Sequence, residues 1–242
     1  MRQYISFITT VAATAVCFLL VSCQKEFIDP SQPSFDQSAL AKGPGGTVVR
    51  NPLKFPSEVS PSGLNLAAAP GTSDLGGGQF SNVWSYNGSF AGPTIRAASG
   101  STASIVLQNN LPERSITHWH GMVVSPANDG QPMQAVPGGS TYSYSFTINQ
   151  RAGLNFYHPH PHMLTGKQVY YGLTGAFIVN DAEEAALNLP SGAYEVPLII
   201  RDATLDAVGN LSYKPTAGGF FGKIPLVNGT KNPYLEVQRA FY

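Results

Sequence analysis

The chain has little cysteine and few charged residues, and each of these shortages argues against a class of protein. Only two of its 242 residues are cysteines, Cys17 and Cys23, and both lie near the N-terminus. A disulfide framework or a cysteine-rich zinc domain is therefore excluded for the rest of the sequence. Charged residues make up 12%, the formal net charge is zero and no basic stripe is present, so electrostatics give no support for nucleic-acid binding.

Glycine and proline are abundant instead, with 25 and 19 residues, which predicts many short strands joined by turns. Residues 141–148 alternate polar and apolar side chains, as a half-buried strand does. Residues 103–107 and 176–179 have the apolar character of buried strands, and residues 181–187 are the clearest helix candidate. These patterns predict an all-β sandwich with Greek-key connections.

All five histidines lie between positions 118 and 162, in the runs His-Trp-His at 118–120 and His-Pro-His-Pro-His at 158–162. In a strand, residues i and i+2 point to the same face, so His118 and His120 should project together, as should His158 and His160. Pro159 cannot donate a ladder hydrogen bond, so the second pair should lie at a strand end or a sheet edge. Two such pairs predict one metal site built from two neighbouring segments. His162 extends the second run, and we expect it to have a supporting or surface role.

The identity of the metal stays open at this level. No thiolate or carboxylate alternates with the histidines, and an all-imidazole set suits copper, zinc or nickel. Four histidines exceed the three protein ligands of a usual catalytic zinc and fit two or more metal ions better. A zinc hydrolase of the His-Glu-x-x-His type is disfavoured, because that motif is absent.

The two histidine runs also resemble the first domain of the multicopper oxidases, a family that includes laccases, bilirubin oxidases and spore-coat-type oxidases. Further similar segments are Gly-Pro-Thr-Ile-Arg at 92–96, residues 106–111 and residues 168–179. The resemblance covers roughly residues 60–242. It implies a cupredoxin-like domain at residues 47–180, which binds copper, and the incomplete start of a second cupredoxin-like domain at residues 181–242.

The same resemblance implies roles for individual residues. His118 would bind a type 2 copper, and His120, His158 and His160 would bind a type 3 pair, in a trinuclear cluster that reduces O2 to water. Asp129 occupies the place of an acidic residue that delivers protons, although Asp-Gly at 129–130 is also a common turn dipeptide.

The chain departs from the family pattern in its lack of a cysteine for a type 1 copper. A type 1 copper needs a thiolate, and no cysteine follows Cys23. We therefore expect the N-terminal part of an oxidase that is inactive alone. The alternative is a non-catalytic copper-binding or copper-buffering lipoprotein. The reducing substrate, whether a phenol, a pigment or a metal ion, is left open.

The N-terminus has the pattern of a targeting segment. Arg2 is followed by an apolar stretch at residues 5–21, and Leu-Val-Ser-Cys at 20–23 resembles the bacterial lipoprotein cleavage box. This predicts a signal peptide at residues 1–22, lipidation of Cys23 and a flexible tether at residues 23–46. The expected location is the bacterial cell envelope, with the protein anchored to a membrane by lipid.

Overall fold

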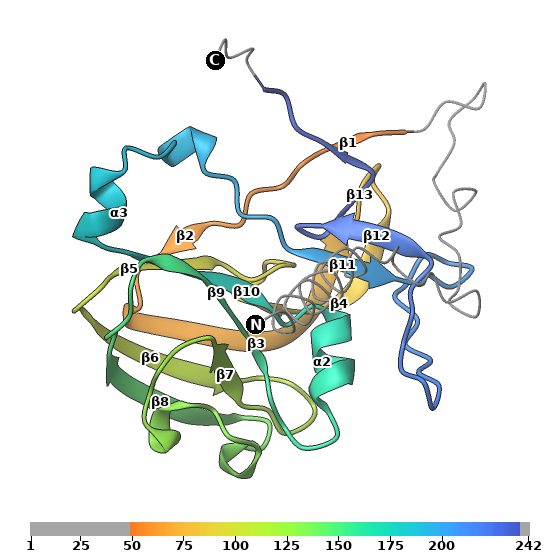
Figure 1. Cartoon of the computed structure of the whole chain (residues 1–242). Coiled ribbons are helices and arrows are strands. Elements are labelled where there is room, and N and C mark those ends of the chain that lie inside the picture. The colour runs from red at the N-terminus through yellow and green to blue at the C-terminus, as the bar shows by residue number, and fades with distance from the viewer. Residues whose placement is uncertain (1–48, 238–242) are drawn as a thin grey trace, which may run out of the picture. The chain divides into compact units, whose positions relative to one another are not determined.

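Half-buried alternating strands form the first sheet of the computed structural model, which describes residues 49–237 (Figure 1). The predicted signal peptide, Cys23 and the predicted tether lie outside the described residues. The sheet has four strands in the order β4-β3-β6-β8. Both predicted strands within it, residues 103–107 and 141–148, are confirmed as β6 and β8 with shifted ends. The bounds are β3 Ser62–Asp74, β4 Phe80–Tyr86, β6 Thr102–Asn109 and β8 Ser140–Thr147.

A second sheet carries both histidine runs. Its five strands have the order β2-β5-β10-β9-β7, so β7 is an edge strand bonded only to β9. The predicted strand at 176–179 is confirmed as β10, and it is buried on both faces, which explains its continuous apolar sequence. The bounds are β2 Glu58–Val59, β5 Thr94–Ala98, β7 Thr117–His120, β9 Gly153–Pro159 and β10 Gly175–Asn180.

The main hydrophobic core lies between these two sheets, because it draws buried side chains from both. Trp119 of β7 and Tyr157 of β9 are completely buried in it. Their rings are 5.9 Å apart, and Trp119 also makes an edge-on contact with Tyr144 of β8 at 4.9 Å. Burial of such large aromatic side chains is worth about 1.5–3 kcal/mol each, so the core holds β7 firmly although β7 is an edge strand.

Helices are few and short. The helix predicted at residues 181–187 is confirmed as α3 (Ala182–Ala186), and the Asp181 carboxylate caps it by accepting the backbone N–H of Glu184 at 2.8 Å. Helix α2 (Thr165–Tyr171) was not predicted from the sequence. Within residues 49–237 there are also three 3-10 turns: η2 Pro126–Asn128, η3 Pro132–Gln134 and η4 Gly192–Tyr194. None of the helices within residues 49–237 is both long and apolar enough to cross a membrane.

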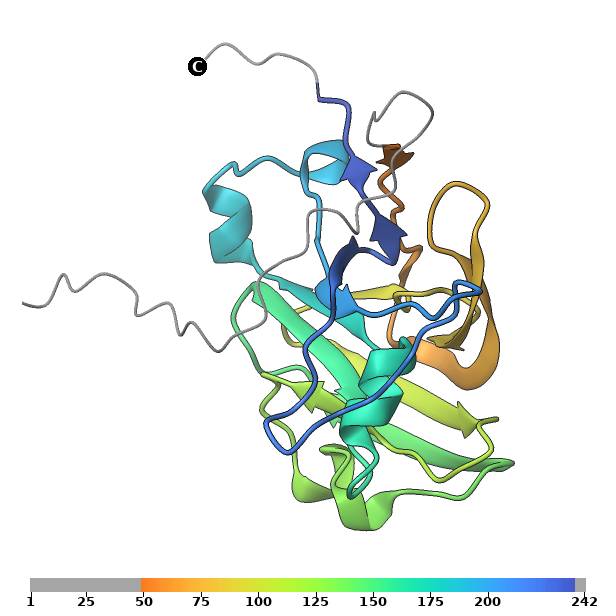
Figure 2. The ribbon, with the colours of Figure 1, turned by 90° about the vertical axis from the view of Figure 1, so that its right-hand side faces the viewer.

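The C-terminal segment takes part in two smaller sheets, one of which includes β1. Strands β11 (Ile200–Ala203), β12 (Ile224–Val227) and β13 (Thr230–Lys231) form one sheet, and β14 (Pro233–Tyr234) pairs with β1 (Asn51–Pro52). Its core is shared, because Ala203 and Leu226 pack in one cluster with Val83, Phe90 and Tyr170. The connection from β11 to β12 passes beside α2 (Figure 2). Residues 49–237 all belong to one compact unit, and the domain boundary near residue 180 stays a prediction.

Residues 195–199, directly before β11, form no strand. A side chain takes the place of a strand partner there. The Asn228 side chain accepts the backbone N–H of Ile199 at 2.8 Å and donates to the Pro197 carbonyl at 3.1 Å. These two backbone groups therefore have hydrogen-bond partners although no neighbouring strand pairs with them.

Candidate metal centre

The two histidine runs meet on the outer face of the β7–β9 pair. The strands are antiparallel, and His118 lies opposite His158, Trp119 opposite Tyr157 and His120 opposite Phe156. Because side chains alternate along each strand, the buried Trp119 and Tyr157 direct the histidines away from the core. His118 and His158 are partly buried, whereas His120 is exposed.

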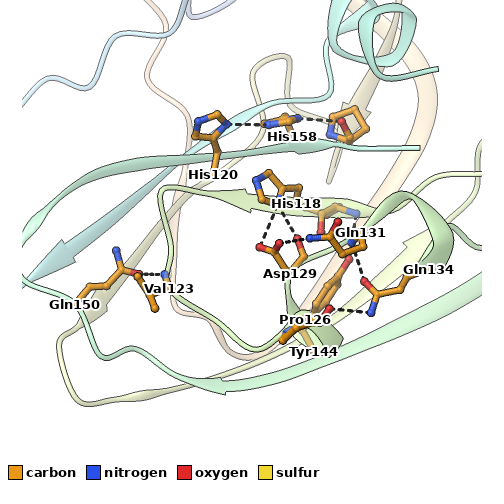
Figure 3. Close-up of polar contacts among 12 residues, drawn as sticks. His118, His120, Val123, Pro126, Asp129, Gln131, Gln134, Tyr144, Gln150 and His158 are labelled. Carbon is orange, nitrogen blue, oxygen red and sulfur yellow. Dashed lines mark hydrogen bonds and ion pairs between the residues drawn. The ribbon is translucent and has the colours of Figure 1, made fainter. Parts of the chain in front are cut away.

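The imidazoles of both runs converge. One ring nitrogen from each of His118, His120 and His158 lies within 4.8 Å of the other two, and Figure 3 shows the three side chains facing a common space. The His160 ring joins them, with its centroid 5.1 Å from that of His118 and 6.0 Å from that of His158. Metal ligation by these four residues remains a prediction, but their rings lie together on the outer face of the β7–β9 pair.

His160 reaches this place although Pro159 ends β9. The backbone N–H of His160 donates to the Ile116 carbonyl at 2.9 Å, which extends the pairing of the two segments by one hydrogen bond. His162 is exposed, and no ring contact joins it to the cluster among the described aromatic residues.

Hydrogen bonding orients His118 and leaves one of its nitrogens free for a ligand. Its Nδ1–H donates to the Asp129 carbonyl oxygen at 2.6 Å, and the Asp129 carboxylate lies 3.3 Å from the same nitrogen (Figure 3). The proton therefore sits on Nδ1 and the lone pair on Nε2. Metal-binding histidines are typically oriented in this way by a partner at the other ring nitrogen.

His158 is oriented in the same manner. Its Nδ1–H donates to the Pro159 carbonyl at 2.9 Å, which leaves the Nε2 lone pair facing Nδ1 of His120 at 3.3 Å. Burial lowers the pKa of His158 to about 4, so the ring is neutral at pH 7 and able to bind a metal. Two nitrogens that each lie ~2.0–2.1 Å from one tetrahedral metal ion, as imidazole does on zinc, are about 3.3 Å apart. The pair therefore fits a shared ion.

The surroundings of the cluster fit a metal in two further ways. Nδ1 of His160 is buried and has no hydrogen-bond partner among the described residues. A buried polar atom without a partner is rare and needs an explanation, which a metal ion in the cluster would supply. The donor set is all imidazole, a set that copper accepts.

The position of Asp129 depends on two neighbours that sequence analysis did not single out as functional. The Gln131 side-chain N–H donates to the Asp129 carboxylate. Gly130, at a φ of +72°, has no room for a side chain, because a Cβ there would lie 1.9 Å from the Thr117 carbonyl oxygen. The Asp-Gly turn thus lies directly against β7. A buried glutamine, Gln168, was also missed, because no local pattern distinguishes it from an ordinary helix residue.

Comparisons with known proteins agree with this geometry. A family model described as multicopper oxidase matches residues 68–184. The multicopper oxidase mco of Staphylococcus aureus is 36% identical over 202 residues, which are 79% of this chain and 44% of that protein. The crystal structure of the McoA multicopper oxidase from Aquifex aeolicus has a TM-score of 0.72 and 40% identity, and the match covers 79% of this chain and 44% of that one. The expected cupredoxin-like, all-β fold is thereby confirmed.

Another similar protein is named for cell division and not as an oxidase. The cell division protein FtsP of Shigella dysenteriae is 35% identical over 167 residues, which are 68% of this chain and 36% of that protein. In each of these three comparisons, the chain spans less than half the length of its relative.

Proposed function

Because residues 68–184 of this chain belong to the multicopper oxidase family, we propose that the chain supplies four histidine ligands to the trinuclear copper cluster of an oxidase. The complete enzyme would couple four one-electron oxidations of a substrate to the reduction of O2 and four protons to two waters. The observation that carries the proposal is the convergence of imidazoles from β7 and from the end of β9.

The ring geometry supports a division of the ligands. His118 offers Nε2 and is assigned to the type 2 copper. Nδ1 of His120 and Nε2 of His158 face each other at 3.3 Å and are assigned to one type 3 copper. His160 is assigned to the other. Copper, when bound, supplies the one-electron redox chemistry, while hydrogen bonds to backbone carbonyls hold the His118 and His158 rings in one tautomer.

Asp129 is suited to hold and pass a proton near His118. Its carbonyl oxygen already holds the Nδ1 proton of that ring, and its carboxylate lies 3.3 Å from the same nitrogen. Because Gln131 holds the carboxylate in this orientation, a proton arriving there would be close to the proposed type 2 copper ligand. These contacts support the proposal that Asp129 takes part in the proton delivery that O2 reduction requires.

The remaining parts of the oxidase are proposed to come from sequence outside these residues. A type 1 copper needs a thiolate, and the only cysteines here are Cys17 and Cys23. The reducing substrate would deliver electrons at that type 1 copper, and a phenol, a pigment or a metal ion would each serve. Export and lipid anchoring through Cys23 would place the enzyme in the cell envelope. Metabolic labelling with a radioactive fatty acid should label the unmodified protein but not Cys23→Ser, and an unmodified protein without label would refute the anchor.

Copper titration tests the site. The purified chain should bind Cu(II) with imidazole-nitrogen hyperfine structure in its electron paramagnetic resonance spectrum. His118→Ala and His158→Ala should each lower the copper stoichiometry. His162→Ala is the matched control, because it removes an exposed histidine of the same run and should leave uptake unchanged. Full copper uptake by both site variants would refute the ligand assignment.

A second candidate function is copper binding or buffering without catalysis. Not every protein similar to this chain is named as an oxidase, since one is named for cell division. Sequencing the gene past codon 242 and measuring O2 consumption by its full product distinguish the two functions. A His-Cys-His segment with copper-dependent O2 consumption supports the oxidase, and copper binding without O2 consumption supports buffering.

A further inference from the structure

Gln168 is a completely buried polar residue of α2 that contacts the segment entering β7. Its side-chain carbonyl accepts the Ser115 hydroxyl at 2.8 Å. Its side-chain N–H groups donate to the Arg114 carbonyl at 2.9 Å and to the Glu113 carboxylate at 3.1 Å. A buried amide with three partners resists displacement, because moving it would leave buried polar groups unpaired.

The same helix is tied to the second histidine run. The backbone N–H of Leu164 and the hydroxyl of Thr165 both donate to the Pro161 carbonyl, at 3.2 and 3.0 Å. The backbone N–H of Gln168 then donates to the Leu164 carbonyl at 2.9 Å. A short, continuous set of hydrogen bonds therefore leads from the residue after His160 to the Gln168 side chain.

These contacts link the entry to β7 with the segment that follows β9, next to the candidate metal centre. On one side, the His160 backbone N–H is bonded to the Ile116 carbonyl at 2.9 Å. On the other, Gln168 is bonded to Ser115, the residue before Ile116. Because β7 is an edge strand bonded only to β9, Gln168 supports the entry to β7 from outside the sheet. The two histidine runs are thereby held as one unit.

We propose that Gln168 is a positioning residue of the metal centre, and that its hydrogen bonds set the placement of the His160 ring against the His118 ring, now 5.1 Å apart. Gln168 acts through the backbone and does not touch the metal. This proposal rests on the proposed function, since it assumes that both rings bind copper.

Tyr170 provides a matched control on the same helix. It is also buried, and its hydroxyl also has three hydrogen-bond partners: the Thr204 carbonyl at 2.9 Å, the Ser212 carbonyl at 3.1 Å and the Thr204 backbone N–H at 3.1 Å. These partners belong to the β11–β12 connection, which lies beside α2 (Figure 2). Gln168→Leu and Tyr170→Phe thus each remove the side-chain hydrogen bonds of a buried residue of α2, but only the first affects the entry to β7.

The experiment compares both variants with the unmodified chain by Cu(II) titration and by hydrogen exchange of the metal-free protein. We expect both variants to lower the melting temperature. Only Gln168→Leu should weaken Cu(II) binding, by about tenfold or more, and speed the exchange of the His160 amide. Equal copper affinity and equal His160 exchange in the two variants would overturn the proposal.

A second variant and a second outcome separate this proposal from misfolding and from failure of the proposed function. If Gln168→Leu does not fold, Ser115→Ala removes one of the same hydrogen bonds and should produce a smaller change in the same direction, while no change would count against the proposal. If the unmodified chain itself binds no copper through His118 and His158, the proposed function fails. Faster His160 exchange in Gln168→Leu would still support the positioning role in the metal-free protein.

Discussion

The two faces of the β7–β9 pair differ completely in what they contribute. Trp119 and Tyr157 face inward and are completely buried, whereas the neighbouring His118, His120 and His158 face outward and gather their ring nitrogens within 4.8 Å. One face therefore supplies stability, and the other carries the imidazoles of the proposed metal site. The core residues of these strands determine where that proposed site lies, because they fix which side chains are left outside.

The largest expected effect comes from breaking the inner face. Trp119→Ala removes a fully buried ring that touches Tyr144, Phe146, Tyr157 and Phe177. The loss should be about 3–5 kcal/mol in the free energy of unfolding, measured by urea denaturation. His120→Ala is the control on the outer face, where it removes the stack on Phe156, and should lower stability by less than about 1.5 kcal/mol. Similar losses in the two variants would contradict the division of roles.

A second, smaller effect is expected where the C-terminal segment meets α2. Arg201 donates to the carbonyls of Val169 and Tyr170 at the end of this helix and lies over the Phe90 ring at 5.0 Å. Burial lowers the pKa of Arg201 to about 10, so the group is still charged at pH 7. Arg201→Met should cost about 1.5–3 kcal/mol in urea denaturation. Copper affinity should stay the same, and a parallel loss of copper would show that the C-terminal segment also shapes the site.

Phe156 tests whether the outer face contributes any stability. Its ring stacks on His120 at 4.3 Å with an interplanar angle of 20° and is 42% exposed. Phe156→Ala should cost only about 0.5–1.5 kcal/mol in urea denaturation, while nuclear magnetic resonance of the metal-free protein should show a more mobile His120 ring. A loss as large as that of Trp119→Ala would refute the smaller contribution of this face to stability.

The smallest effect on stability is expected at Asp181, the N-terminal cap of α3. Hydrogen bonds from Arg151, and from the backbone of Glu184 and Ala152, hold the pKa of Asp181 well below its usual range. A lowered folded-state pKa stabilises the fold above the unfolded pKa of about 3.9. Asp181→Asn should therefore lower the melting temperature slightly at pH 7. The difference from the unmodified chain should shrink as the pH falls below about 4, and a difference that grows there would contradict the assignment.

Much of the fold and of the site was predictable because it depends on local alternation. The strands β6, β8 and β10 follow from polar–apolar patterns or apolar runs, and the common face of His118 and His120 follows from their spacing. The long strand β3 was not predicted, since its Ala-, Gly- and Pro-containing sequence gives no strong strand signal. Its place depends on pairing with β4 and β6.

The rest of the site depends on contacts between distant residues. The tautomer of His118 is set by the Asp129 carbonyl, and the entry to β7 is held by Gln168, which lies 53 residues from Ser115 in the sequence. Helix α2 has only seven residues and no side-chain cap at its start, so its helical pattern is too short to recognise. Such features follow from tertiary packing and were not visible in any local pattern.

The most direct test of the shared metal site is a crystal of the protein soaked in Cu(II), with diffraction recorded at the copper absorption edge. An anomalous peak between Nδ1 of His120 and Nε2 of His158, with a second peak within bonding distance of Nε2 of His118, is the predicted result. Copper bound only at His162, or no peak between the two histidine runs, would contradict it.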